Sequence, residues 1–189
     1  MLIYLHGFRS GPQSHKAQSL AQRMRERGLA AQWWCEQLQW GPARAIAQIS
    51  AVIEASPTTP TLVGSSLGGF YATHLAEQFG LRAVVVNPAV ISPISLAPYM
   101  GEQSMIYTGE TFSFTQAHLE ELRSMQHSTL RDPDRYWLLA ETGDEVLDYR
   151  DAERFYQGAR QTILDGGDHS FTRWPDYLDS IIDLACPAN

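Results

Sequence analysis

The stretch TLVGSSLGGF, residues 61–70, passes from a strand-like run into a cluster of serines and glycines and then into helix-forming sequence. Its centre, GSSLG (residues 64–68), matches the Gly-x-Ser-x-Gly pattern, in which the serine occupies a sharp turn between a strand and a helix. A serine on such a turn projects its hydroxyl from the end of the strand and is a candidate nucleophile. We therefore predict that Ser66 is a nucleophile and that Ser65 fills the variable position.

The two glycines of this pattern have a steric explanation. A tight strand-to-helix turn brings neighbouring backbone close, and Gly64 and Gly68 have no Cβ to obstruct it. A different interpretation is a Gly/Ser-rich loop that only turns the chain or binds a phosphate at the helix N-terminus. No Walker lysine follows the turn, so we adopt the nucleophile interpretation.

On both sides of this turn, short apolar runs alternate with segments of helical periodicity. Strands are expected at residues 2–6, 30–38, 60–64, 82–89, 135–142 and 161–167. Helices are expected at residues 14–28, 42–55 and 67–80, and within residues 149–159 and 175–185. In the helix at 42–55, we expect Ile46, Ile49 and Ile53 to form the buried stripe. The alternation predicts an α/β protein whose parallel sheet is flanked by helices.

The connection between the fourth and fifth strands is unusually long. Residues 91–131 exceed an ordinary helix-to-strand connection, and we expect them to form a cap inserted in a single domain of residues 1–189. Most of its apolar side chains are expected to pack the cap against the sheet, and a few to line an acyl pocket. These apolar residues are Ile94, Leu96, Tyr99, Met100, Met105, Ile106, Phe112, Phe114, Leu119, Leu122 and Met125.

Composition restricts the class of protein. The formal charge of −7 and the lack of a Lys/Arg cluster exclude a nucleic-acid binder. Cys35 and Cys186 are far apart, which suits a reducing compartment and leaves open a single disulfide between them, and no spacing indicates a metal site or a cofactor. The opening residues MLIYLHGF carry no signal-peptide pattern, and no apolar run reaches the roughly 20 residues of a membrane span. We expect a cytoplasmic protein with a small-molecule partner, and the sequence leaves its oligomeric state open.

A serine nucleophile needs a general base and a carboxylate that orients it. His169 follows the last predicted strand, whereas the other histidines lie in predicted helices, in the insertion or, as His6 does, at the end of the first strand. After the fifth predicted strand, the segment ETGDEVLDY offers Asp144, Glu145 and Asp148 as carboxylates. We favour Asp144 because it is closest to the end of the strand, and Asp148 is the alternative unless it caps the next helix.

The oxyanion that forms in acyl transfer needs hydrogen-bond donors. In the chain order Ser-Asp-His, typical of α/β-hydrolases, the donors are one backbone N–H after the nucleophile and one from an early loop. Here these are the N–H groups of Leu67 and Phe8. Gly7 is expected to let the loop pass close to the substrate, and His6 to shape it.

Five segments together resemble the YqiA family of small α/β-hydrolase-fold esterases. They are YLHGFRSGP, VGSSLGGFYAT, VVVNPAV, WLLAETGDEVLDYR and GGDHSFT. The resemblance implies an esterase that acts on short-chain acyl esters or, as the alternative, on acyl-CoA thioesters, with a triad of Ser66, Asp144 and His169. We expect a reduced α/β-hydrolase fold with six parallel strands in the order 2-1-3-4-5-6.

Two other functions stay open at this stage. Hydrolase folds also serve as non-catalytic ligand-binding proteins, although these usually lose a triad residue. An acyl-CoA thioesterase would need cations for the CoA phosphates, and the negative net charge gives no general attraction. Arg9, Lys16 and Arg173 are the candidates for a local attraction.

Overall fold

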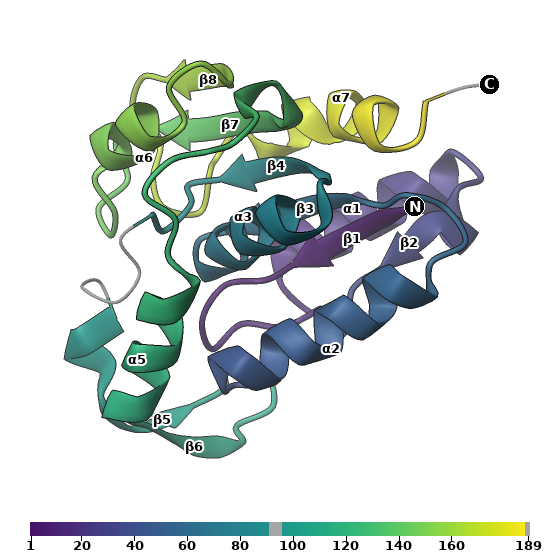
Figure 1. The fold of residues 1–189 in the computed structure, drawn as a ribbon. Coiled ribbons are helices and arrows are strands. Elements are labelled where there is room, and N and C mark those ends of the chain that lie inside the picture. Colours follow the sequence, from purple (N-terminus) through teal and green to yellow (C-terminus); the bar gives the residue numbers. More distant parts are fainter. Residues whose placement is uncertain (91–95, 188–189) are drawn as a thin grey trace.

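A computed structural model describes residues 1–90 and 96–187 of the chain, and its centre is one parallel sheet (Figure 1). In these ranges the sheet has six strands in the order β2-β1-β3-β4-β7-β8. Their bounds are Leu2–Leu5 for β1, Trp33–Trp34 for β2, Thr61–Ser65 for β3, Arg82–Val86 for β4, Tyr136–Glu141 for β7 and Arg160–Leu164 for β8. The predicted six-stranded parallel sheet and its strand order are confirmed.

The central strands are buried on both faces. All residues of β3 and β7 are buried, as are all residues of β4 except the first, Arg82. Continuous apolar runs such as Val84–Val86 suit this position, because each face of the strand contacts a layer of helices. Successive side chains point to opposite faces, so Tyr4 belongs to one core cluster and Leu5 to the other.

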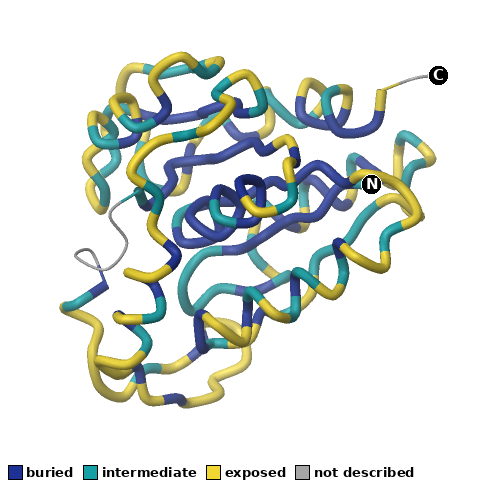
Figure 2. The backbone as a smooth tube through the Cα atoms, in the orientation of Figure 1, coloured by how far each residue is buried: buried dark blue, intermediate teal, exposed yellow. Residues whose placement is uncertain are grey.

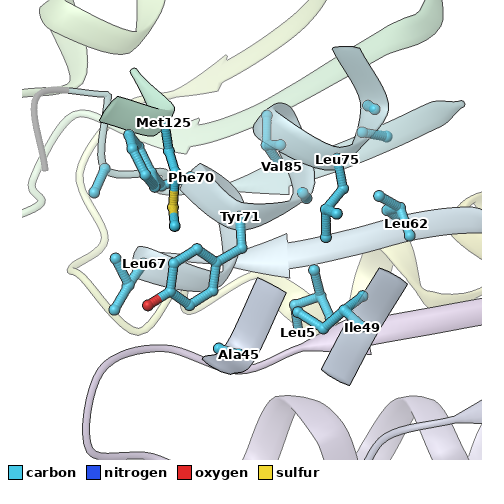
Figure 3. Packing of buried hydrophobic residues seen from close by; sticks show 14 of the residues in the cluster. Leu5, Ala45, Ile49, Leu62, Leu67, Phe70, Tyr71, Leu75, Val85 and Met125 are labelled. Atoms are coloured by element: carbon cyan, nitrogen blue, oxygen red, sulfur yellow. The ribbon is translucent and has the colours of Figure 1, made fainter. Parts of the chain in front are cut away.

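Helices cover both faces of the sheet. Helices α1 (His15–Glu26) and α7 (Trp174–Ala185) lie together on one face, and α2 (Pro42–Ala55), α3 (Leu67–Phe79) and α6 (Tyr149–Phe155) lie on the other (Figure 1). The central strands β1, β3, β4 and β7 are largely buried, whereas the outer surfaces of the helices are exposed (Figure 2). Ile49 of α2 and Leu75 of α3 pack with Leu5 and Leu62 of the strands in the core between these layers (Figure 3).

Two local expectations differ from the structure. The strand expected at residues 30–38 is reduced to Trp33–Trp34, because Ala30–Gln32 form a 3-10 turn and β2 has β1 as its one neighbour at the sheet edge. In α2, Ala45 is fully buried with Ile49 and Ile53, while Ile46 is only partly buried. The helix therefore faces the core with a small side chain where we expected Ile46.

The segment between β4 and β7 forms a separate small hairpin and a helix. Residues 91–95, with which the expected cap begins, lie outside the described residues, and Ile94 is one of them. Beyond a 3-10 turn at Ala97–Tyr99, β5 (Gly101–Ser104) and β6 (Thr111–Phe114) pair antiparallel and are followed by α5 (Gln116–Met125). α5 packs against α2. None of the described helices is long and apolar enough to cross a membrane.

Candidate active site

Ser66 lies at the turn between β3 and α3 in an unusual backbone conformation. Its φ is +56° and its ψ is −122°, a region that a residue with a side chain adopts at a cost in free energy. The surrounding backbone holds this conformation, because the Ser66 N–H donates to Val86 O at 3.0 Å and the N–H groups of Gly69 and Ala89 donate to Ser66 O. The hydroxyl is thus fixed at the carboxyl end of the sheet.

Glycines make this turn sterically feasible. A Cβ at Gly68 would lie 2.0 Å from the carbonyl oxygen of Leu5, and one at Gly64 would lie 2.1 Å from the carbonyl oxygen of Gly68. A Cβ at Gly7 would lie 3.3 Å from Ser66 Cβ, so the loop after β1 passes directly beside the serine. A side chain at Gly68 or Gly64 would therefore displace the neighbouring backbone.

The structure brings Ser66, His169 and Asp144 together from three strand ends. The distance from His169 Nε2 to Ser66 Oγ is 3.1 Å. On the other side of the ring, His169 Nδ1 lies 2.8 Å from Asp144 Oδ2 and 2.9 Å from Oδ1. With the carboxylate accepting from Nδ1–H, Nε2 is left as an acceptor for the serine hydroxyl.

Asp144 is held by its own loop. Its side chain is 2% exposed, although it leads a loop at the surface. Besides contacting the imidazole, its Oδ1 accepts hydrogen bonds from the backbone N–H groups of Val146 and Leu147, both at 2.9 Å. These bonds orient the carboxylate toward His169.

The other two carboxylates of this segment have different partners. Asp148 is the N-cap of α6, where its Oδ1 accepts from the Arg150 backbone N–H at 3.0 Å. Glu145 Oε2 accepts from the backbone N–H of His169 at 3.0 Å. The contact with the His169 ring therefore falls to Asp144, and Asp148 has the capping position that its place before the helix suggested.

Two backbone N–H groups beside Ser66 are available as donors. Among the residues that the structure describes, neither the N–H of Phe8 nor that of Leu67 has a hydrogen-bond partner. His6 is buried and fixes the loop that carries Phe8, since its Nε2 accepts from the Leu38 backbone N–H at 3.0 Å and its Nδ1 donates to Gly7 O at 2.9 Å. Burial lowers the pKa of His6 to about 4, so this ring is neutral at pH 7.

Sequence reasoning missed Glu141, which organises the loop of His169. This carboxylate is 0% exposed at the end of β7. Its Oε2 accepts from the backbone N–H groups of Asp168 at 3.0 Å and Thr172 at 2.8 Å. Its Oε1 accepts from Thr172 Oγ1 at 2.9 Å and from the Arg173 backbone N–H at 3.2 Å. One side chain thus holds both flanks of His169.

Asn87 was missed as well, although it directly follows the valine run of β4. Its Nδ2 donates to the carbonyl oxygens of Asp168 at 3.0 Å and His169 at 3.3 Å, and its Oδ1 accepts from the Glu141 N–H at 3.0 Å. Its φ is +40°, which asparagine tolerates better than most residues do. Glu141 and Asn87 are both polar residues at the carboxyl end of a buried strand, a position that marks them as close to the site but does not reveal their partners.

A cavity of about 730 Å³ opens beside the serine. Ser66 and His169 line it, together with Leu96, Tyr99 and Ile106 from the segment between β4 and β7. Most other apolar residues of that segment pack in the core, as expected. They are Met105, Phe112, Phe114, Leu119, Leu122 and Met125. Met100 is exposed.

The three cations considered for phosphate binding are already engaged in hydrogen bonds. The Arg9 guanidinium donates to Ser104 O at 2.9 Å and to Gln103 Oε1 at 3.0 Å. Arg173 donates to Asp165 O at 2.6 Å and to the buried carboxylate of Glu141. Lys16 lines the cavity and donates one hydrogen bond to a backbone carbonyl.

A sequence model of the uncharacterised protein family UPF0227 matches residues 1–186. The chain belongs to this family. UPF0227 is the YqiA family, so the predicted family membership is confirmed. UPF0227 carries no activity in its description, so the family assignment leaves the reaction to be argued from the site.

Solved structures similar to this UPF0227 chain are α/β-hydrolases. Mouse alpha/beta hydrolase domain-containing protein 10 matches with a TM-score of 0.69 and 16% identity, over 97% of this chain and 88% of that one. A monoacylglycerol lipase from Paleococcus ferrophilus matches with a TM-score of 0.68 and 14% identity, over 97% of this chain and 92% of that one. Est1E from Butyrivibrio proteoclasticus matches with a TM-score of 0.65 and 15% identity, over 97% of this chain and 85% of that one. At these identities the similarities show the fold, which is the predicted α/β-hydrolase fold.

Proposed function

We propose that the protein is a serine esterase that hydrolyses short-chain carboxylic esters, with Ser66 as nucleophile, His169 as base and Asp144 as orienting acid. The observation that carries this proposal is the continuous contact from Ser66 Oγ to His169 Nε2 at 3.1 Å and from His169 Nδ1 to Asp144 Oδ2 at 2.8 Å. Names of structural neighbours, which include a monoacylglycerol lipase and an esterase domain, support the reaction class.

In the first half of the reaction, Ser66 Oγ attacks the ester carbonyl carbon while His169 Nε2 accepts the hydroxyl proton. The carbonyl oxygen becomes an oxyanion, which we assign to the free N–H groups of Phe8 and Leu67. Asp144 keeps the imidazole in the tautomer that can accept this proton and stabilises the imidazolium that results.

The second half releases both products. The tetrahedral intermediate collapses, the alcohol leaves with the proton from His169 Nε2, and the acyl group stays on Ser66 as an ester. His169 then deprotonates a water molecule that attacks this acyl-enzyme. Collapse of the second intermediate releases the carboxylic acid and returns the proton to Ser66.

We further propose that residues 91–131 form a cap on the single domain and that its apolar side chains receive the acyl chain. Leu96, Tyr99 and Ile106 supply the apolar part of the cavity wall. Since most other apolar residues of this segment are buried against the core, the apolar wall is short, which favours short acyl chains.

The alternative, an acyl-CoA thioesterase, uses the same mechanism on a different leaving group. It would need cations free to bind the CoA phosphates. Arg9 and Arg173 already donate to protein acceptors, and Arg173 faces the buried carboxylate of Glu141. Of the three cations, Lys16 keeps N–H groups to spare, and a single cation favours carboxylic esters over the several phosphates of acyl-CoA.

A fluorophosphonate probe and a chromogenic ester test this proposal together. The probe is expected to attach to Ser66, and Ser66→Ala is expected to abolish both labelling and hydrolysis of p-nitrophenyl butyrate. Ser124→Ala, which alters an exposed serine of α5, is the matched control and should leave both unchanged. Peptide mapping of the probe to Ser65, or near wild-type turnover by Ser66→Ala, would contradict the assignment. Labelling without turnover of any p-nitrophenyl ester or acyl-CoA would indicate a ligand-binding protein.

A further inference from the structure

Part of the cavity wall is polar, and we call this part its polar end. Beside Ser66 it includes Tyr4, Ser14, Lys16 and Ser65, and the apolar Phe171 also lines the cavity. Tyr4 is 1% and Ser65 4% exposed, so their hydroxyls reach the cavity from buried positions. This composition contrasts with the apolar wall formed by the segment between β4 and β7.

Two hydroxyls of buried residues line this end of the cavity. Within the described part of the chain, the polar neighbours of the Tyr4 hydroxyl are the hydroxyls of Ser65 and Ser14, and hydroxyls grouped in this way keep hydrogen-bonding capacity for a ligand. Burial raises the pKa of the Tyr4 phenol, and the hydroxyls of Ser65 and Ser14 lie close enough to oppose this shift. Both hydroxyls line the cavity, so they can donate to an occupant that accepts hydrogen bonds.

Lys16 brings a positive charge to the same wall. It is the only lysine of the chain. Its Nζ donates to the carbonyl oxygen of Ser170 at 2.6 Å, and no carboxylate of the described residues lies within 4.0 Å of it. Burial lowers the pKa of Lys16 to about 8 against the opposing effect of nearby carboxylates, Asp168 first among them. The ammonium is therefore mostly charged at pH 7 and has N–H groups left to donate.

The first turn of α1 adds to the positive potential. Ser14 caps this helix by accepting from the Ala17 N–H at 3.4 Å, and the first turn contains no acidic residue. The partial positive charge of a helix N-terminus thus meets the Lys16 ammonium and the Tyr4 and Ser65 hydroxyls. Such a set of donors around one positive charge suits a carboxylate, which only accepts hydrogen bonds.

The position of Lys16 relates this polar end to the leaving group. In the proposed reaction, His169 gives its proton to the departing alcohol, so the alcohol must lie on the side of the imidazole. Lys16 binds the carbonyl of Ser170, the residue after His169. The polar end is therefore beside the alcohol, while the apolar wall of Leu96, Tyr99 and Ile106 is left for the acyl chain.

We propose that Tyr4, Ser65 and Lys16 form a subsite for a carboxylate carried by the leaving alcohol, so that the preferred substrates are acyl esters of hydroxy acids. This proposal rests on the proposed esterase function, because that function defines which side of the cavity holds the alcohol.

Matched esters test the subsite. The butyrate ester of meta-hydroxybenzoate carries the carboxylate, and that of meta-hydroxybenzamide has nearly the same shape without the charge. We expect Lys16→Met to lower the ratio of their kcat/KM values, charged over neutral, by about tenfold or more, as for the loss of a hydrogen bond to a charged group. Tyr4→Phe should lower the same ratio. Arg25→Met removes an equal charge from an exposed position of α1 and should change it less than about twofold.

An equal decrease of kcat/KM for both esters in Lys16→Met would overturn the proposal. That outcome would mean that Lys16 acts only by holding the His169 loop through Ser170, since a displaced loop impairs every substrate alike. An unchanged ratio in Lys16→Met would overturn it as well.

A second measurement needs no turnover. Because Lys16 is the only lysine, reductive methylation followed by peptide mapping reports the accessibility of this one side chain. We expect meta-hydroxybenzoate to slow methylation of Lys16 and meta-hydroxybenzamide to leave it unchanged. Equal rates with both compounds would refute the subsite. Failure of the wild-type protein to hydrolyse either ester would instead count against the esterase function, and the two failures can be told apart.

Discussion

Replacing Glu141 by glutamine should destabilise the protein and impair its site at the same time. Glu141→Gln keeps one acceptor oxygen and turns the other into an NH₂ group, which is a donor. Each carboxylate oxygen now accepts from at least two groups, for example Oε2 from the N–H groups of Asp168 and Thr172. Whether the NH₂ group takes the place of Oε1 or of Oε2, it points at groups that are themselves donors. Two of these donors then lose their acceptor.

The size of the effect follows from these contacts. A buried donor left without an acceptor costs about 1–3 kcal/mol. Two such donors give an expected loss of about 2–6 kcal/mol in the free energy of unfolding, and the Arg173 guanidinium adds little because it is 40% exposed. For a chain of this length, that corresponds to a decrease in Tm of about 4–24 °C.

Thermal unfolding at several pH values measures the loss of stability. The value of kcat for p-nitrophenyl butyrate measures the damage to the site. Burial acts to raise the pKa of Glu141, but the hydrogen bonds from Thr172, Asp168 and Arg173 outweigh it, and the pKa is lowered. A lowered pKa means that the carboxylate stabilises the fold above its unfolded-state pKa and that this contribution is lost as the pH falls. The difference in Tm between wild type and variant should therefore be full at pH 7 and shrink below about pH 4.

The loop of His169 should move in this variant, so kcat should fall by about tenfold to a hundredfold. Glu54→Gln, at an exposed position of α2, is the control and should alter neither quantity. A Glu141→Gln variant with unchanged Tm and unchanged kcat would refute the role assigned to the carboxylate.

Three further predictions concern the turn, the acid and the cap. Gly68→Ala should leave little or no folded protein, because its Cβ would overlap the Leu5 carbonyl oxygen; a soluble variant with wild-type Tm would contradict this. Asp144→Asn should lower kcat by orders of magnitude through the wrong His169 tautomer while Asp148→Asn has far less effect, and the reverse order in folded variants would reassign the acid. Across p-nitrophenyl esters from acetate to palmitate, kcat/KM should rise a fewfold per carbon and then fall when the pocket is full; a profile highest at acetate would exclude a cap-lined acyl pocket.

The sheet could be predicted from sequence because its signals are local. Val84–Val86 forms an unbroken apolar run, and the other predicted strands are each followed by a segment of helical periodicity, which is sufficient to order parallel strands. The strand ends then meet at one edge, and this explains why a serine after one strand, an aspartate after another and a histidine after a third come into contact. At the edge of the sheet the local signal was weaker, and the two tryptophans of β2 were predicted as part of a longer strand.

Glu141 and Asn87 could not be recognised in the same way. A glutamate is rarely fully buried, and here it is buried because its partners are backbone groups of a loop more than 25 residues away along the chain. Asn87 likewise bonds to carbonyls 81 and 82 residues away. Backbone donors and acceptors carry no sequence signature, so a pattern of side chains does not reveal which polar residue will be surrounded by them.

The order of the strands also determines when during folding the site comes into existence. Ser66 lies at the turn of the β3–α3 element, which forms from nearby residues, but it is 103 residues from His169. Closing so long a loop costs entropy that only the completed β4–β7 and β7–β8 pairings offset. In a refolding experiment, covalent labelling of Ser66 should therefore lag behind the recovery of helical circular dichroism, and the labelling rate reports the arrival of the last strands.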